Sequence, residues 1–139
     1  MSLAVRTVLF LALSASVLSA QTAVCATSAV PPIVRAEGLA ERIGDIDIVC
    51  NGQPNTGLVA NFTVAMNANI TNRISSGNTL AGIIFTVDSG AGPQPVLSPP
   101  LLLTPNTLSF SGVSAAFSSQ GLVSLKIADI RVNASSIPV

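Results

Sequence analysis

Between Leu58 and Thr71, apolar and polar residues alternate with a period of two. The apolar positions are Leu58, Ala60, Phe62, Val64, Met66, Ala68 and Ile70. A β-strand turns successive side chains to opposite faces, whereas helical spacing would scatter these residues around the helix. The pattern therefore predicts a long strand with one apolar face. Such a strand is not stable alone in water, so the remaining chain must supply partner strands and a second layer.

The first twenty residues have the organisation of a secretory signal peptide. Arg6 precedes an apolar run at Val8–Leu18, and small residues follow at Ser19 and Ala20. The run is shorter than the roughly 20 apolar residues that span a membrane. We therefore predict a signal peptide at 1–20, a mature domain at 21–139 without a membrane span, and a secreted or cell-surface location.

The chain contains two cysteines, Cys25 and Cys50. In an oxidising compartment they would pair, and the 25-residue loop would add about 3 kcal/mol to the free energy of unfolding. A metal or redox pair is the alternative, but the spacing fits neither a CxxC motif nor a zinc ribbon. Cleavage after Ala26 is the alternative to cleavage after Ala20, because it places Val24 rather than the bulky Leu18 three residues before the cut. It would remove Cys25 and leave Cys50 unpaired.

Further strands are predicted by short alternating or β-branched segments: Ile33–Ala36, Asp45–Cys50, Ala81–Val87, Thr107–Val113 and Leu122–Asn133. The segment 21–32 is small, polar and ends in two prolines, which predicts an extended lead-in. The turn-rich segment 51–57 predicts an antiparallel connection from Cys50 into the Leu58 strand. Five prolines between 90 and 105 exclude a helix or a central strand there, and predict a crossing between sheets.

The segment Leu122–Asn133 changes phase partway along. Val123, Leu125 and Ile127 fit one face of a strand, while Ile130 and Val132 fit the other face. A bulge or corner near 128–129 would reconcile the two halves.

About six short strands with turn signals roughly every ten residues indicate an all-β protein. We predict an immunoglobulin-like antiparallel β-sandwich, with a small closed barrel as the alternative. The sequence stops after Ala134–Val139 without a terminal strand. This predicts a sandwich that lacks its last strand, in a chain that is the first part of a longer protein.

Several segments resemble the N-terminal β-sandwich module of secreted, largely uncharacterised bacterial proteins of the acidobacterial type. They are Pro31-Pro32, Arg35, Glu37-Gly38, Glu41, Gly44-Asp45-Ile46, Cys50, Asn69–Arg73, Ser109–Val113 and Ile127–Ala134. The resemblance covers nearly the whole mature chain. It implies an extracellular β-sandwich and cleavage before Cys25, and it supplies no catalytic or binding residues.

The composition limits the chemistry that the chain can perform. Charged residues make up 9% of the chain, the net charge is zero, and His, Trp and Tyr are absent. Nucleic-acid binding is not expected without clustered Lys and Arg. Without His, a Ser-His-Asp or Cys-His arrangement is impossible, and Lys126 is the only candidate base for a Ser-Lys dyad. Glu37 and Glu41 could form a glycosidase pair, but no Trp or Tyr could line a sugar-binding cleft.

The aspartates and asparagines offer two further readings. Carboxylate oxygens are suitable ligands for Ca²⁺, and a calcium site could form if strand ends bring several aspartates together. The simpler interpretation is that these aspartates form surface ion pairs with Arg42 and Arg131. The four candidates are Asp45, Asp47, Asp88 and Asp129. Three N-glycosylation sequons begin at Asn61, Asn69 and Asn133. In a bacterial protein they would not predict glycosylation, and they indicate only a polar face rich in Asn and Thr. That Asn- and Thr-rich face could form hydrogen bonds with a partner or a polysaccharide.

The sequence thus predicts a secreted or cell-surface, non-enzymatic β-sandwich module with a structural or adhesive role. An open sheet edge could accept another strand and so drive assembly. The alternatives are a carbohydrate- or calcium-binding extracellular module, a secreted hydrolase that uses carboxylates, and a truncated fragment of a larger surface protein. No catalytic residue, metal ligand or cofactor is assigned, and the expected partners are extracellular proteins or polysaccharide.

Overall fold

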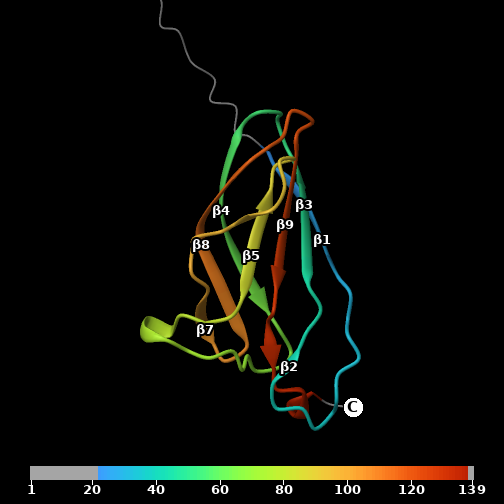
Figure 1. Ribbon diagram of the computed structural model, residues 1–139, viewed down its shortest axis with the longest axis vertical. Helices are drawn as coiled ribbons and strands as arrows, with labels where there is room; N and C mark the ends of the chain where they lie inside the picture. Colours follow the sequence, from blue (N-terminus) through green and yellow to red (C-terminus); the bar gives the residue numbers. More distant parts are fainter. Residues whose placement is uncertain (1–21, 138–139) are drawn as a thin grey trace, which may run out of the picture.

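In the computed structural model, which describes residues 22–137, the chain forms an antiparallel β-sandwich (Figure 1). The larger sheet has the order β1 (Val24–Ala29), β3 (Ile46–Asn51), β9 (Leu122–Ala128), β5 (Ile84–Asp88) and β6 (Gln94–Pro95). The smaller sheet has the order β4 (Gly57–Ala65), β8 (Thr107–Ala116) and β7 (Leu101–Thr104). The all-β sandwich prediction is confirmed. The predicted signal peptide at 1–20 lies outside the described residues.

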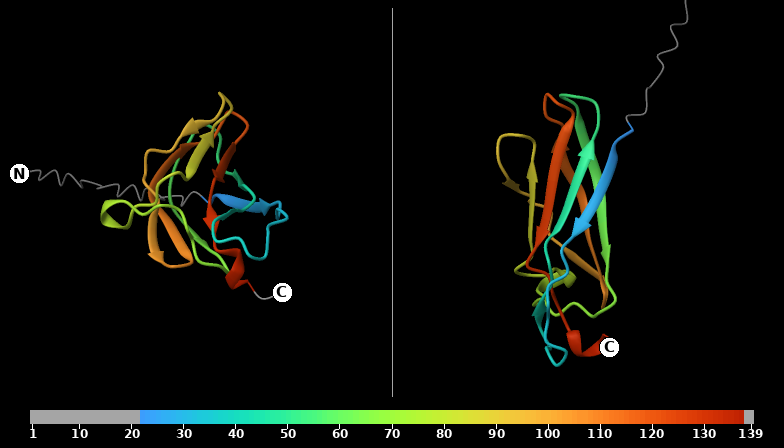
Figure 2. Two further views of the ribbon diagram at one scale, coloured as in Figure 1. Left: turned by 60° about the horizontal axis from the view of Figure 1, so that its bottom comes forward. Right: turned by 90° about the vertical axis from the view of Figure 1, so that its right-hand side faces the viewer.

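A two-stranded ribbon and a short 3₁₀ helix lie near the C-terminal end of the described chain (Figure 2). β2 (Glu41–Arg42) pairs with β10 (Arg131–Val132) in a two-stranded ribbon. Two short 3₁₀ helices are η1 (Ser76–Asn78) and η2 (Ala134–Ser136).

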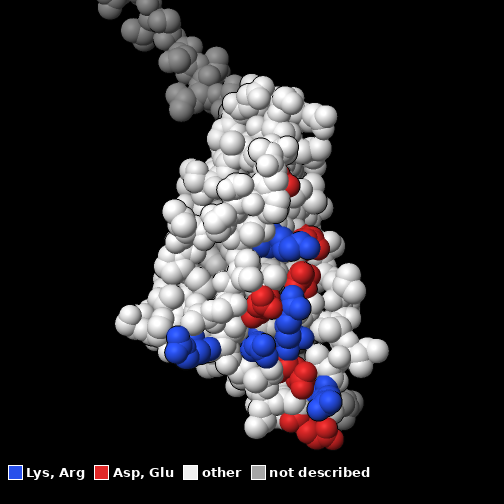
Figure 3. Space-filling model, in the orientation of Figure 1, with Lys and Arg blue, Asp and Glu red and all other residues white. Residues whose placement is uncertain are grey.

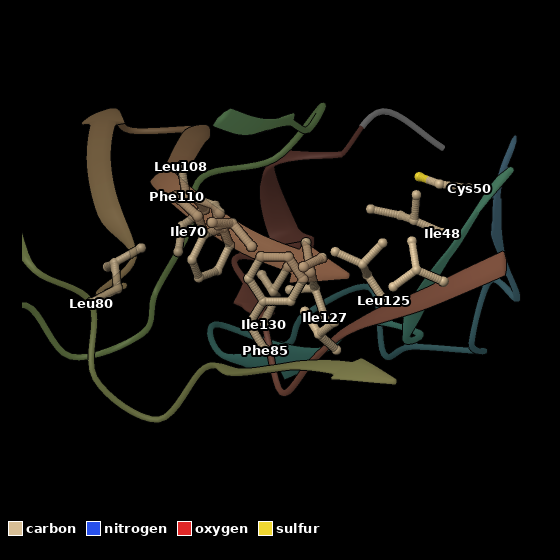
Figure 4. Packing of buried hydrophobic residues seen from close by; sticks show 14 of the residues in the cluster. Ile48, Cys50, Ile70, Leu80, Phe85, Leu108, Phe110, Leu125, Ile127 and Ile130 are labelled. Atoms are coloured by element: carbon tan, nitrogen blue, oxygen red, sulfur yellow. The ribbon is translucent and has the colours of Figure 1, made fainter. Parts of the chain in front are cut away.

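Aliphatic side chains and four phenylalanines, Phe62, Phe85, Phe110 and Phe117, form the core of the sandwich (Figure 4). Phe85 on β5 contacts Phe62 on β4 edge-to-face at 5.5 Å, and Phe110 on β8 in a tilted arrangement at 4.5 Å, both between ring centroids. These rings join the larger sheet to the smaller one. Leu108 and Ile127 are fully buried beside them, so the core depends on inward-facing strand residues, as the alternation predicts.

The alternating strand is shorter than predicted. β4 shows the expected alternation of exposed and half-buried residues from Gly57 to Ala65, but it does not continue to Thr71. Met66 N–H still donates to Asn106 C=O beside β8. Ile70 then bridges to Val132, so the chain has left β8 for the β10 end of the molecule. The apolar alternation continues because Ala68 and Ile70 remain buried in the new surroundings.

The predicted hairpin between β3 and β4 is wrong. β3 pairs with β1 and β9, whereas β4 pairs with β8. The turn-rich segment between them carries the chain from one sheet to the other. The proline-rich segment also crosses between the sheets, as predicted, and it contributes the edge strands β6 and β7.

The N-terminal part of the described chain also differs from expectation. The lead-in contains β1, which pairs along its whole length with β3. The predicted strand Ile33–Ala36 does not form, and the Ile33 side chain is fully exposed. Strand-favouring residues there find no partner strand, so their propensity is not realised.

The predicted corner in the last segment is confirmed. β9 ends at Ala128, Asp129 adopts a left-handed conformation with φ of 62°, and β10 begins at Arg131. The buried Asn72 side chain holds this corner: Nδ2 donates to Asp129 C=O at 3.0 Å, and Oδ1 accepts from Arg131 N–H at 2.7 Å.

Candidate functional site

The cysteine pairing is confirmed, and it lies at an edge of the larger sheet. Cys25 on β1 is directly opposite Cys50 on β3, and the two form a disulfide. Cys50 is completely buried, whereas all six β1 residues are exposed. β1 is therefore held by backbone pairing and the disulfide, with no buried side chain of its own. Cleavage after Ala26 would remove Cys25 and cut through this strand.

Three of the four aspartates considered as calcium ligands form an ion-pair network. Arg42 Nε contacts Asp129 Oδ1 at 2.7 Å, and Arg42 also contacts Asp45 Oδ1 at 3.0 Å. Lys126 Nζ lies 3.3 Å from Asp47 Oδ1 and 3.8 Å from Asp45 Oδ2. The carboxylates are thus neutralised by cations, which favours the surface ion-pair reading. The predicted partner Arg131 is not part of this network.

The fourth aspartate lies in its own turn. Asp88, at the end of β5, accepts hydrogen bonds through Oδ1 from Gly90 N–H at 2.7 Å and Gly92 N–H at 3.0 Å. Within residues 22–137, no group of three or more His, Cys, Asp or Glu side chains is arranged to hold a metal ion. The structure therefore offers no assembled calcium site in this part of the chain.

The residues considered for catalysis lie in ordinary structural positions. Lys126 is on β9 and points its charge at Asp45 and Asp47. Glu37 is exposed in a turn, and Glu41 is half-buried on β2 opposite Val132. In Figure 3 most charged residues lie between the middle and the bottom of the face shown, with one small acidic spot above them, and the uppermost part of this face is uncharged.

β4 is an edge strand of the smaller sheet: among residues 22–137 it pairs with β8 on one side and with no strand on the other, which is its free edge. On the side of β8, Thr56 C=O accepts from Phe117 N–H, and Met66 N–H donates to Asn106 C=O, so even-numbered residues bond toward β8. Backbone groups alternate in direction along an antiparallel strand. The N–H and C=O groups that face away from β8 therefore belong to Gly57, Val59, Asn61, Thr63 and Ala65.

The side chains of β4 leave this edge accessible. The same five odd-numbered residues are exposed, and the Val59 side chain is 72% exposed. The inward-facing residues of β4 are only half-buried, although they pack against the core. The strand has nine residues and contains no charge and no proline. Long neutral edges of this kind are templates for pairing with another strand.

The three sequon asparagines do not form a common surface. Asn61 lies on β4, and its Oδ1 accepts from Gly112 N–H at the bulge of β8. Asn69 is exposed beyond the end of β4, and its C=O accepts from Asn133 N–H. The Asn133 side chain caps η2 by accepting from Ser135 N–H. The polar face predicted from the alternation is therefore limited to β4 itself.

Comparisons with known proteins do not extend this description. No protein-family model matches the chain, and no curated protein and no solved structure matches it significantly. From residue 22 to residue 137, no helix has the length and apolar character needed to cross a membrane.

Proposed function

We propose that the mature chain is a secreted or cell-surface, non-enzymatic β-sandwich module with a structural or adhesive role, and that it joins a second copy of itself along the free edge of β4. The supporting observation is the edge itself. Its nine residues carry five pairs of outward-facing backbone groups, and no charged side chain or proline guards them.

The edge is self-complementary in an antiparallel arrangement. With Asn61 opposite Asn61 of the second copy, Val59 faces Thr63 and Gly57 faces Ala65. No like charges meet in this register, and each copy offers the same surface, as a two-fold interface requires. Pairing would also cover part of the half-exposed apolar side of β4.

Two observations support the remaining parts of the proposal. The Cys25–Cys50 disulfide is the kind of bond that persists in oxidising compartments, in agreement with the predicted signal peptide. The only lysine, Lys126, is engaged by Asp45 and Asp47, and the chain contains no histidine to activate a nucleophile.

The test is the mass of the processed protein in solution, measured by analytical ultracentrifugation over a range of concentrations. We expect a reversible dimer that the double variant Val59→Lys/Thr63→Lys converts to a monomer, because four lysines would meet at the shared edge. The matched control is Leu122→Lys/Ser124→Lys, which places two charges at exposed positions on the central strand β9. The control should remain dimeric.

Two results would contradict the proposal. One is a wild-type protein that stays monomeric at every concentration. The other is a dimer that tolerates the two lysines on β4. Thermal unfolding of each variant shows whether the sandwich itself is intact, so a lost dimer can be separated from a lost fold.

A further inference from the structure

A hollow lies where the segment after β4 passes the corner between β9 and β10. Its volume is about 630 Å³, and its lining includes Thr71, Arg73, Ala81, Gly82, Asp129 and Arg131. This volume is within the range of small-molecule sites. The hollow does not involve the free edge of β4, so it is independent of the proposed self-association.

Two cations of this hollow have no carboxylate partner within the described part of the chain. That part contains five cations, since Arg6 is the sixth of the chain. Arg42 and Lys126 form its four ion pairs. The Asp129 carboxylate, which also lines the hollow, is held by Arg42 Nε at 2.7 Å. Arg73 and Arg131 therefore bring uncompensated positive charge to one place.

The backbone on which the two arginines stand is firmly held. Between them lies Asn72, which is 7% exposed and bonds to Ala81 C=O, Asp129 C=O and Arg131 N–H. Arg73 C=O accepts from Ala81 N–H, and Arg131 C=O accepts from Thr71 N–H, both at 2.8 Å. The backbone of the site is therefore already ordered, so the loss of freedom on binding falls mainly on the two exposed arginine side chains.

The remaining lining offers hydrogen bonds and space. Arg131 uses Nη1 to donate to Ala40 C=O at 3.3 Å, which leaves its other guanidinium donors available. Gly82 has φ of 81° and no side chain, which keeps that wall of the hollow open.

We infer that this hollow binds the carboxylate of a small organic acid, either free or carried as a uronate residue of an acidic polysaccharide. The planar guanidinium groups of Arg73 and Arg131 match the geometry of a carboxylate and can bind it through paired N–H donors. The small walls at Ala81 and Gly82 leave room for the ring that carries the carboxylate. The net positive charge of the hollow selects against neutral sugars.

The experiment is titration of the processed, ¹⁵N-labelled protein with galacturonate and short oligogalacturonates, followed by NMR. We expect shifts of the Ala81, Gly82 and Arg131 amide resonances that saturate with ligand. Arg73→Gln should weaken binding about tenfold, the loss expected from one charged hydrogen-bond pair. Arg35→Gln is the matched control, because it removes the same charge from an exposed arginine that does not line the hollow. It should bind as the wild type does.

The probes distinguish the sources of the carboxylate and the competing ligands. Equal binding per uronate residue of galacturonate and its oligomers would assign a free acid, and stronger binding of the oligomers would assign the polysaccharide. Tighter binding of inorganic phosphate, or binding of an aspartate-rich peptide without galacturonate, would overturn the assignment. So would unchanged affinity in Arg73→Gln with an unchanged melting temperature.

Discussion

The two sheets of the sandwich differ in charge, because the larger sheet contains charged residues and the strands of the smaller sheet contain none. β3, β5 and β9 of the larger sheet include Asp47, Asp88 and Lys126, whereas β4, β7 and β8 contain no charged residue. The ion pairs among Arg42, Lys126 and their aspartates lie at one end of the larger sheet. Solvation of the smaller sheet therefore depends on neutral Asn, Ser and Thr side chains, which oppose association less strongly than charges do.

Each sheet has one edge strand that is protected against strand pairing and one that is not. In the larger sheet, β1 is fastened by the disulfide, and β6 has two residues and ends in a proline. In the smaller sheet, β7 is short and lies between prolines, but β4 has neither a proline nor a charge. Two of these edges, β6 and β7, are thus protected by short length and proline, whereas β1 and β4 are not; β4 is the longer of the two, with nine residues against six.

The largest effect should come from the ring that joins the sheets at the centre. Phe110→Ala removes a side chain that is 1% exposed, and we expect it to lower the free energy of unfolding by about 3–5 kcal/mol. Phe62→Ala, on the half-buried edge strand, should cost about 2 kcal/mol, because less of its surface leaves water on folding. Urea unfolding of the two variants measures both values.

Equal losses in the free energy of unfolding for Phe110→Ala and Phe62→Ala would contradict the expectation that the centre of the core is more completely buried than the side next to β4. A larger loss for Phe62→Ala would show that the β4 side is buried in solution. Repeating the measurement at low and high protein concentration shows whether self-association supplies that burial.

The second effect tests how the larger sheet holds its edge strand β1. The double variant Cys25→Ala/Cys50→Ala removes the link across a 25-residue separation and should cost about 3 kcal/mol in urea unfolding. Because β1 contributes no buried side chain, the core should stay folded, with protection from hydrogen exchange lost first in β1. Complete unfolding under native conditions would show instead that β1 is essential to the sandwich.

Local patterns predicted the strands well but not their partners. Alternation identified β4, β3 and β8, and the phase change identified the corner at Asp129. Turn-forming residues after Cys50 showed that the chain changes direction, but they carry no information about which sheet it enters. β1 was missed because both of its faces are exposed, so no apolar alternation marks it.

The sequence predicted the disulfide but not the edge position of β4 or the role of Asn72, because the last two depend on non-local contacts. The disulfide follows from the number of cysteines and the predicted compartment, and it could be assigned without the fold. The openness of β4 depends on sheet order, which is non-local. Asn72 stands in a stretch rich in Asn and Thr, and nothing in that stretch distinguishes it from exposed Asn67; only its contacts with Asp129 and Arg131 do.

The third effect concerns the corner where the larger sheet ends. Asn72→Ala leaves two carbonyl groups and one N–H group without their side-chain partner, and we expect a loss of about 1–3 kcal/mol. Asn67→Ala, at an exposed position nearby, should change the free energy of unfolding by less than about 0.5 kcal/mol. A similar small change in both variants would mean that the corner does not depend on the buried amide.

The smallest effect asks whether charge or backbone conformation holds that corner. Asp129→Asn removes the ion pair with Arg42, whose side chains are 51% and 36% exposed, and should cost at most about 1 kcal/mol. Asparagine tolerates the left-handed conformation of residue 129, so the loss should disappear in about 1 M salt, where exposed charges are screened. Asp129→Ala should cost about 1 kcal/mol more, at any salt concentration, because alanine adopts that conformation poorly. A salt-independent loss in Asp129→Asn would instead assign the corner to a specific hydrogen bond of the carboxylate, which salt does not screen.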